Sequence, residues 1–266
     1  MLLHNIYAKT LRDHWKGVLG WGLGLAAIAA LEVVIYPSIR ERADEMNRLV
    51  ANYPEAFKAM FGLEDFTSGA GFIQAELYSL VVPLVLIALA ISFGAGATAG
   101  EEEHKTVDLL LATPVTRGRV VVQKLLALVT GSVVVGLALT ATLWLGSMFQ
   151  DMGIGLDRLL AATASAVLLS LCFGGVALAV GCATGRRALA AATAAGLAIA
   201  GFLINSLSSL AEGLKPWRPV TLFYQYASND PLRNGLDVGN AAVLLAVAAA
   251  MALAALVAFR RRDLAT

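Results

Sequence analysis

The residues with the clearest chemical potential form one charged run between two long apolar segments. Three consecutive glutamates, Glu101 to Glu103, are followed by His104, Lys105 and Asp108. Adjacent carboxylates cannot lie in hydrocarbon, because burying an unpaired charge there is costly. The run must therefore lie in water or in a groove of another protein. The chemistry it offers is charge-assisted hydrogen bonding to a basic surface.

The spacing within this run predicts a short amphipathic helix. Residues 101–112 contain no helix breaker, and the acids lead, where a helix N-terminus favours negative charge. Val107, Leu110 and Leu111 share one side. Pro114 disfavours helical geometry at Thr113 and should end the helix there. Two interpretations fit this pattern equally well, a helix that docks onto a partner and a helix that lies on lipid.

Motifs for catalysis, nucleotide binding or metal binding do not accompany the charged run. The sequence contains no P-loop motif, no H-E-x-x-H and no G-x-S-x-G. His4, His14 and His104 have no second ligand at metal spacing, which favours solvated or interfacial histidines. Cys172 and Cys182 fall inside one apolar segment and are interpreted as packing residues. We expect a chain that is not an enzyme and holds no metal or cofactor.

The elements that must carry the charged run are membrane spans. Of the 266 residues, 58% are hydrophobic, and the mean hydropathy is +0.73, well above the composition of soluble domains. Six apolar segments are long enough to cross about 30 Å of hydrocarbon as helices. They cover approximately residues 17–36, 77–99, 120–148, 159–183, 188–210 and 238–259. We expect an all-α polytopic membrane protein with a single transmembrane domain over residues 1–266.

Polar segments at the start of the chain are expected at membrane surfaces. Residues 1–16 are amphipathic, with cationic residues on one side, and suit either anionic headgroups or a partner protein. Pro37 is expected to end the first span. Residues 38–71 then form a first outer loop, in which Ile39, Ala43, Met46 and Val50 make one helical stripe. A second short helix is expected from about residue 54, followed by a glycine-rich turn at residues 69–71.

The later segments carry fewer surface signals. Pro83 is expected to kink the second span, and Gly96 and Gly100 have the spacing that permits close helix approach. Residues 212–237 form a third outer loop. Its aromatic residues are interpreted as anchors at headgroup level. They are Trp217, Phe223, Tyr224 and Tyr226.

The distribution of Lys and Arg predicts that both termini are cytoplasmic. With that orientation twelve cationic residues lie inside and eight outside, and most of the outside ones sit in long loops beside acids. The inside set is Lys9, Arg12, Lys16, Lys105, Arg117, Arg119, Lys124, Arg186, Arg187 and Arg260 to Arg262. The outside set is Arg40, Arg42, Arg48, Lys58, Arg158, Lys215, Arg218 and Arg233. The charged helix is then cytoplasmic.

Ionisable residues avoid the middle of the predicted spans. Glu32 and Glu76 lie near span ends, and none of the six segments has a central Asp, Glu, Lys, Arg or His. A proton- or sodium-coupled carrier usually needs such a group near the midplane. We therefore expect this protein to take its energy or its signal from a partner.

The charged run resembles the signature of ABC-type exporter permeases, the six-span membrane subunits that include the sodium- and multidrug-exporter permeases. The resemblance rests on Glu101-Glu102-Glu103 through Asp108-Leu109-Leu110-Leu111-Ala112-Thr113-Pro114-Val115-Thr116-Arg117, with Lys124 downstream. Tyr53-Pro54-Glu55, Phe61-Gly62, Glu76, Pro83 and the ending Phe259-Arg260-Arg261-Arg262-Asp263-Leu264 are also similar. The chain departs from the family at Lys105, where glycine is common.

The resemblance implies a coupling helix at residues 101–113, between the second and third spans, that docks into a separate P-loop ATPase subunit. ATP and Mg²⁺ would bind that partner, and this chain would hold no cofactor. Residues 1–16 would form a connecting helix beside the coupling helix. The implied contact residues are Glu101, Glu102, Glu103, Thr106, Asp108, Leu109, Leu110, Leu111, Pro114 and Arg117.

The same resemblance implies a multi-pass protein of the inner (plasma) membrane. Its partners would be the ATPase, a second copy or a related permease, and membrane lipid, with no nucleic acid. The implied activity is ATP-dependent export, and the apolar spans favour a hydrophobic drug, antibiotic or lipid as substrate. The alternative from another class is a membrane anchor or regulator that recruits a cytoplasmic protein without transport.

Overall fold

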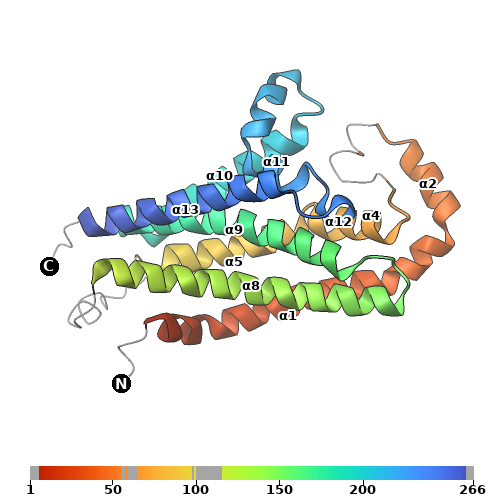
Figure 1. Ribbon diagram of the computed structural model, residues 1–266. Helices are drawn as coiled ribbons and strands as arrows, with labels where there is room; N and C mark the ends of the chain where they lie inside the picture. The colour runs from red at the N-terminus through yellow and green to blue at the C-terminus, as the bar shows by residue number, and fades with distance from the viewer. Residues whose placement is uncertain (1–5, 55–57, 59–64, 98, 100–115, 262–266) are drawn as a thin grey trace.

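The computed structural model describes residues 6–54, 58, 65–97, 99 and 116–261, and their regular elements are helical (Figure 1). Six helical stretches in this part of the chain are long and apolar enough to cross a membrane. They are α1 (Ile6–Glu41), the stretch formed by α4 (Gly69–Ile73), η1 (Gln74–Tyr78) and α5 (Val81–Ala97), α8 (Arg117–Phe149), α9 (Leu156–Thr184), α10 (Arg187–Leu207) and α13 (Val238–Arg261). The predicted all-α class with six spans is confirmed.

Helix α9 lies at the centre of the bundle. It packs against α5, α8, α10 and α13, while α1 packs mainly along α8. The described beginning and end of the chain lie at the same end of the bundle, which we call the terminal end (Figure 1). Helices α1 and α8 both run away from it, since Val18 lies beside Gly131 and Val33 beside Gly146. The large side chains of the main core lie between these helices.

Helices α5 and α9 cross in close contact at two glycines. A Cβ atom on Gly94 would lie 2.2 Å from the carbonyl oxygen of Gly174, so this crossing leaves no room for a side chain. Close packing of small residues is a main source of helix association in lipid. The sequence had suggested Gly96 and Gly100 for such a contact. Gly96 faces His14 with ordinary spacing, and Gly100 lies outside the described residues.

The first span is longer than the sequence predicted. Helix α1 continues to Glu41 with Pro37 inside it, so the expected end at Pro37 is wrong. Proline removes only one helical hydrogen bond, and neighbouring packing can compensate for that loss. Here Tyr36 is buried, and its ring lies 5.7 Å from the ring of Phe72 in α4. That contact holds the last turns of α1 against the second span.

The second span starts earlier than predicted. The expected turn at residues 69–71 is wrong, because Gly69 begins helix α4, and the Ser68 hydroxyl accepts a hydrogen bond from the Gly71 amide at 3.0 Å. Serine is a favoured N-cap, which explains the start. The irregularity in this span is the π-helical turn η1, whereas Pro83 lies inside the regular helix α5.

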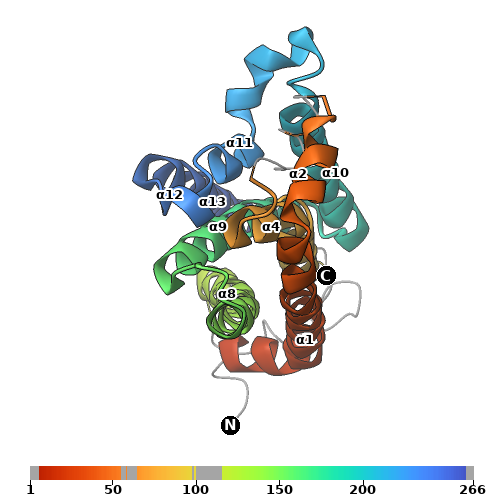
Figure 2. The same cartoon turned by 90° about the vertical axis from the view of Figure 1, so that its right-hand side faces the viewer.

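Short helices cover the end of the bundle opposite the termini, which we call the loop end. In α2 (Ala43–Ala51), Met46 and Val50 pack against the core together with Ile39, as the predicted stripe requires. The second expected helix of this loop falls mostly outside the described residues. Three short elements join α10 to α13, and the first of them projects away from the bundle (Figures 1 and 2). They are η2 (Glu212–Val220), α11 (Leu222–Ala227) and α12 (Pro231–Asn234).

Candidate functional site

Most of the residues predicted to contact a partner lie outside the described part of the chain. Residues 100–115 are not described, which leaves out Glu101, Glu102, Glu103, Thr106, Asp108, Leu109, Leu110, Leu111 and Pro114. Arg117 is described, and it is the half-buried first residue of α8. The coupling helix therefore stays a prediction. The structure describes the two helices that flank it, α5 and α8, which we call the frame.

Lys124 joins the two sides of that frame. Its side chain is only 4% exposed, and its Nζ atom donates a hydrogen bond to the carbonyl oxygen of Ala97. Ala97 lies at the described limit of α5, and Lys124 lies two turns inside α8. A buried ammonium needs an oxygen partner, and the Ala97 carbonyl supplies one. The sequence analysis had counted Lys124 among the cytoplasmic cations and had not predicted its burial.

A second apolar cluster surrounds this hydrogen bond at the terminal end. It draws side chains from five helices, so the start of α1, the end of α5, the start of α8 and the ends of α9 and α13 are packed together. Its buried members are Ile6, Ala97, Val120, Val121, Leu178, Cys182, Ala255 and Phe259. Both cysteines are buried thiols, as predicted for packing residues.

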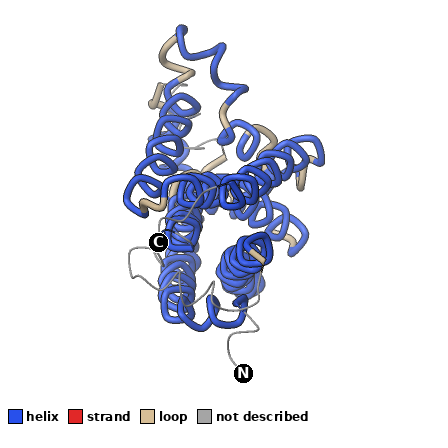
Figure 3. Tube along the Cα trace, turned by 90° about the vertical axis from the view of Figure 1, so that its left-hand side faces the viewer, coloured by secondary structure: helices blue, strands red, loops and turns tan. Residues whose placement is uncertain are grey.

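The first turns of α1 run across the terminal end before the helix turns along the bundle (Figures 2 and 3). The Tyr7 amide donates to Gln123 Oε1 at 3.3 Å, and the Tyr7 hydroxyl lies 3.1 Å from Thr130 Oγ1. The His14 ring stacks on Phe93 of α5, with centroids 4.3 Å apart. Residues 6–16 therefore attach to α8 and α5 next to Lys124. They belong to the same helix as the first span.

A second polar region lies at the loop end, where η1 changes the helical register. The Ser79 amide donates to the Gln74 carbonyl at 2.8 Å, five residues back, which is the π-helical spacing. A π turn is rare and recurs at functional sites. The wider turn brings Gln74, Tyr78 and Ser79 to the same cavity.

Tyr226, in α11, lines the same cavity. The residue is 4% exposed, and its hydroxyl donates to the carbonyl oxygen of Tyr78 at 2.7 Å. Burial, followed by the nearby Tyr78 and Asp230, raises the pKa of Tyr226 well above its ordinary value, so the hydroxyl keeps its proton and remains a donor. Phe223 is also buried, between Phe173 and Phe202.

These positions correct the expectation that the aromatic residues of the third outer loop are headgroup anchors. Trp217 is 62% exposed, but Phe223 and Tyr226 belong to the core. The cause is local, since the Thr221 side chain caps α11 by accepting from the Tyr224 amide at 3.2 Å. The capped helix directs Phe223 toward α9 and α10 and Tyr226 toward η1.

A chain of hydroxyl groups runs from this region into the bundle. The hydroxyl of Tyr78 lies 2.8 Å from Thr163 Oγ1 of α9, and Thr140 of α8 donates to the same atom at 2.8 Å. All three side chains are buried. Buried polar groups need such partners, and in lipid these bonds hold helices together. The second, third and fourth spans are linked by this network.

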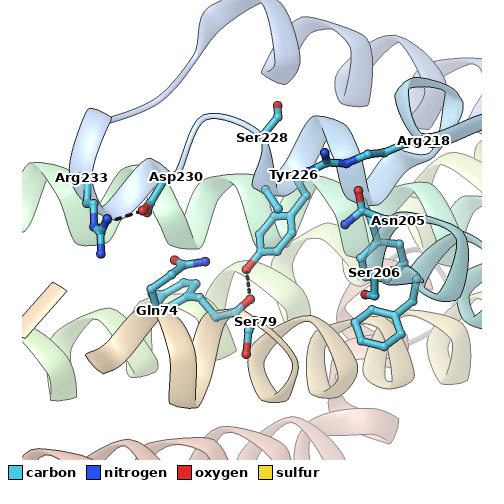
Figure 4. Close-up of a pocket in the computed structure, with 13 residues that line it drawn as sticks. Gln74, Ser79, Asn205, Ser206, Arg218, Tyr226, Ser228, Asp230 and Arg233 are labelled. Carbon is cyan, nitrogen blue, oxygen red and sulfur yellow. Dashed lines mark hydrogen bonds and ion pairs between the residues drawn. The ribbon is translucent and has the colours of Figure 1, made fainter. Parts of the chain in front are cut away.

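The cavity at the loop end has a volume of about 320 Å³ and a mostly polar lining (Figure 4). Gln74 and Asn205 flank Tyr226 in that view. Arg233 forms an ion pair with Asp230 at 3.2 Å on one side. The sequence analysis did not identify this site. Gln74 and Asn205 are isolated amides at the ends of apolar segments, and only the fold brings them to one space.

These features define a multi-pass membrane protein whose polar chemistry lies at the two ends of a helical bundle. The family model described as ABC-2 family transporter protein matches residues 4–264. The chain therefore belongs to the ABC-2 transporter family and is an ABC-type permease, a membrane transport subunit of the kind that works with an ATP-binding subunit. No curated protein matches the chain.

Proposed function

We propose that this chain is the membrane subunit of an ATP-driven exporter, coupled through residues 101–113 to a separate P-loop ATPase that binds ATP and Mg²⁺. Membership of the ABC-2 family supports the transport role. The observation that carries the coupling is the Lys124–Ala97 hydrogen bond. It ties together the two flanks of the charged segment, so that a force applied to that segment reaches α5 and α8 as one unit.

The proposed location is the inner (plasma) membrane. In the proposed orientation the terminal end faces the cytoplasm. Basic residues stand at the short link between α9 and α10 and at the ends of α8 and α13. Cationic residues in short loops and at span ends favour the cytoplasmic side. The described basic residues of those positions are Arg117, Arg119, Arg186, Arg187, Arg260 and Arg261.

The proposed transport unit contains a second copy of this chain or a related permease. Helices α10 and α13 bury only 17% of their most apolar windows inside the chain. Their outer faces are free for lipid or for a second permease, and rigid-body motion between two bundles would provide alternating access. A hydrophobic drug, antibiotic or lipid is the proposed substrate class, because the spans present mainly apolar side chains.

The test is co-purification of an ATPase with the detergent-solubilised protein from its host. Leu110→Arg should abolish co-purification and the associated ATP hydrolysis, because a charge would replace an apolar docking contact. Leu49→Arg is the matched control, since Leu49 is 59% exposed on α2 at the opposite end. It should co-purify normally.

Equal recovery of the ATPase with wild type and both variants would refute the coupling assignment. Recovery of a cytoplasmic protein without ATPase activity would favour an anchor or regulator instead.

A further inference from the structure

The cavity at the loop end presents two hydrogen-bond acceptors that the protein itself does not satisfy. Gln74 Oε1 and Asn205 Oδ1 are both buried and have no hydrogen-bond partner among the described residues. Both residues line the cavity of about 320 Å³. A buried polar atom without a partner is costly, and such atoms point to a missing donor. A ligand that fits here must supply hydrogen-bond donors.

The charges around the cavity favour an uncharged ligand head. Arg233 lies 3.2 Å from Asp230 and 3.8 Å from Asp65, so its charge is balanced by acids of the protein. Arg218 stands at the exposed rim, over the ring of Tyr224 at 5.5 Å. An anion could reach Arg218 only at that exposed rim, and a net charge deeper in the cavity, beside the paired Arg233, would lose its hydration without gaining an ion pair. Hydroxyl groups donate hydrogen bonds without that cost.

An apolar groove continues the cavity toward the membrane. It lies between α5 and α10 and has a volume of about 100 Å³. Phe202 and Phe223 line both spaces, so the polar cavity and the groove share a wall. Leu84 and Ile199 line the groove and are about 60% exposed, which opens it to the lipid side of the bundle.

We propose that the cavity and groove together bind an amphipathic molecule with an uncharged, hydroxyl-bearing head and an alkyl chain. The head occupies the polar cavity and donates to Gln74 Oε1 and Asn205 Oδ1. The chain lies in the groove between α5 and α10, so the molecule enters from the membrane. The size of the polar cavity, at the lower end of the range for small-molecule sites, matches a head of one sugar. Identifying this ligand as a transport substrate rests on the proposed function, but its binding does not.

Binding is best measured on the permease alone, held in amphipol without added lipid, with radiolabelled octyl glucoside as the probe. We expect saturable binding with one site per chain. Octyl glucoside should compete at least tenfold better than glucose or 1-octanol, because only the intact molecule fills both spaces. Competition by 1-octanol as strong as that by octyl glucoside would overturn the proposal, since the head would then contribute nothing.

Two near-isosteric variants test the acceptors. Gln74→Leu and Asn205→Leu should each weaken octyl glucoside binding about tenfold, which corresponds to one hydrogen bond from a desolvated donor. Gln150→Leu, directly after α8 and outside the cavity lining, is the matched control and should bind as wild type does. Binding by the two cavity variants that equals the control, or an absence of saturable binding in wild type, would refute the site.

A folding measurement separates lost binding from lost structure. Leucine removes the desolvation cost of a buried carbonyl oxygen that has no partner, so both cavity variants should unfold at a temperature equal to or above that of the ligand-free wild type. Weak binding together with unchanged or higher thermal stability is the expected pair of results. Because no ATPase is present, failure of the coupling proposal leaves this result unaffected.

Discussion

Removing the amino group of Lys124 should release the end of α5 from α8. In Lys124→Met the side chain keeps nearly the same length, but the carbonyl oxygen of Ala97 loses its buried donor. The surrounding apolar cluster, with Val120 and Val121 fully covered, can accept the methionine. The variant therefore tests the hydrogen bond more than the packing.

The expected cost follows from two opposing effects. A hydrogen bond from a charged donor contributes roughly 1.5–3 kcal/mol. Methionine avoids part of the desolvation of a buried ammonium, which offsets a small part of that contribution. The net loss is about 2 kcal/mol, so opening of the α5 end should become about 30-fold more frequent.

Hydrogen exchange measures this opening directly. Backbone amides in the last turn of α5 should exchange about 30-fold faster in Lys124→Met, while amides in the middle of α9 should not change. Lys16→Met is the matched control, because Lys16 is an exposed lysine at the same end of the bundle. Identical exchange at the end of α5 in wild type, Lys124→Met and Lys16→Met would refute the argument that Lys124 anchors the frame.

Two further predictions concern the centre of the bundle and use denaturant unfolding in detergent. Gly94→Ala should destabilise the protein by about 3 kcal/mol, because the new Cβ would lie 2.2 Å from the Gly174 carbonyl oxygen. Gly196→Ala, where a Cβ meets open space, should be neutral or slightly stabilising. Similar stabilities of the two variants would contradict the close crossing. Thr163→Val should lower the free energy of unfolding by about 1 kcal/mol, because it removes a hydroxyl with two partners. Thr193→Val on the exposed side of α10 should lower it by less. The reverse order would exclude the hydroxyl network as a source of stability.

The spans were predictable because each is a long apolar run, and the length of a run is visible without tertiary information. The ends of α8, α9 and α13 fall within three residues of the predicted limits. The errors arose where a distant contact outweighed a local signal. Pro37 stays helical because Tyr36 packs on Phe72, a partner in the next span. Ser68 begins a helix where two glycines had suggested a turn.

The residues of the candidate sites also differ in how far the sequence alone could predict them. The charged run was identifiable from residue types alone, since three glutamates between apolar segments need a polar surrounding. The role of Lys124 was not, because its acceptor is a backbone carbonyl 27 residues away. Gln74 and Asn205 are even less visible, since each is a single amide in an ordinary setting. Their common cavity depends on how η1, α10 and α11 meet.

The π turn at η1 also makes this protein sensitive to the number of residues in its second span. A π turn holds one residue more than an α turn, and each residue of an α-helix rotates the chain by about 100°. Deleting one residue between Gln74 and Tyr78 would let the π turn become an α turn, and α4 would keep nearly the same facing because either turn covers about one revolution. The change would fall on the turn itself, whose extra width brings Gln74, Tyr78 and Ser79 to one cavity. The hydropathy of the span would not change. A difference of one residue in length at this point would therefore change the polar site without any sign in the composition.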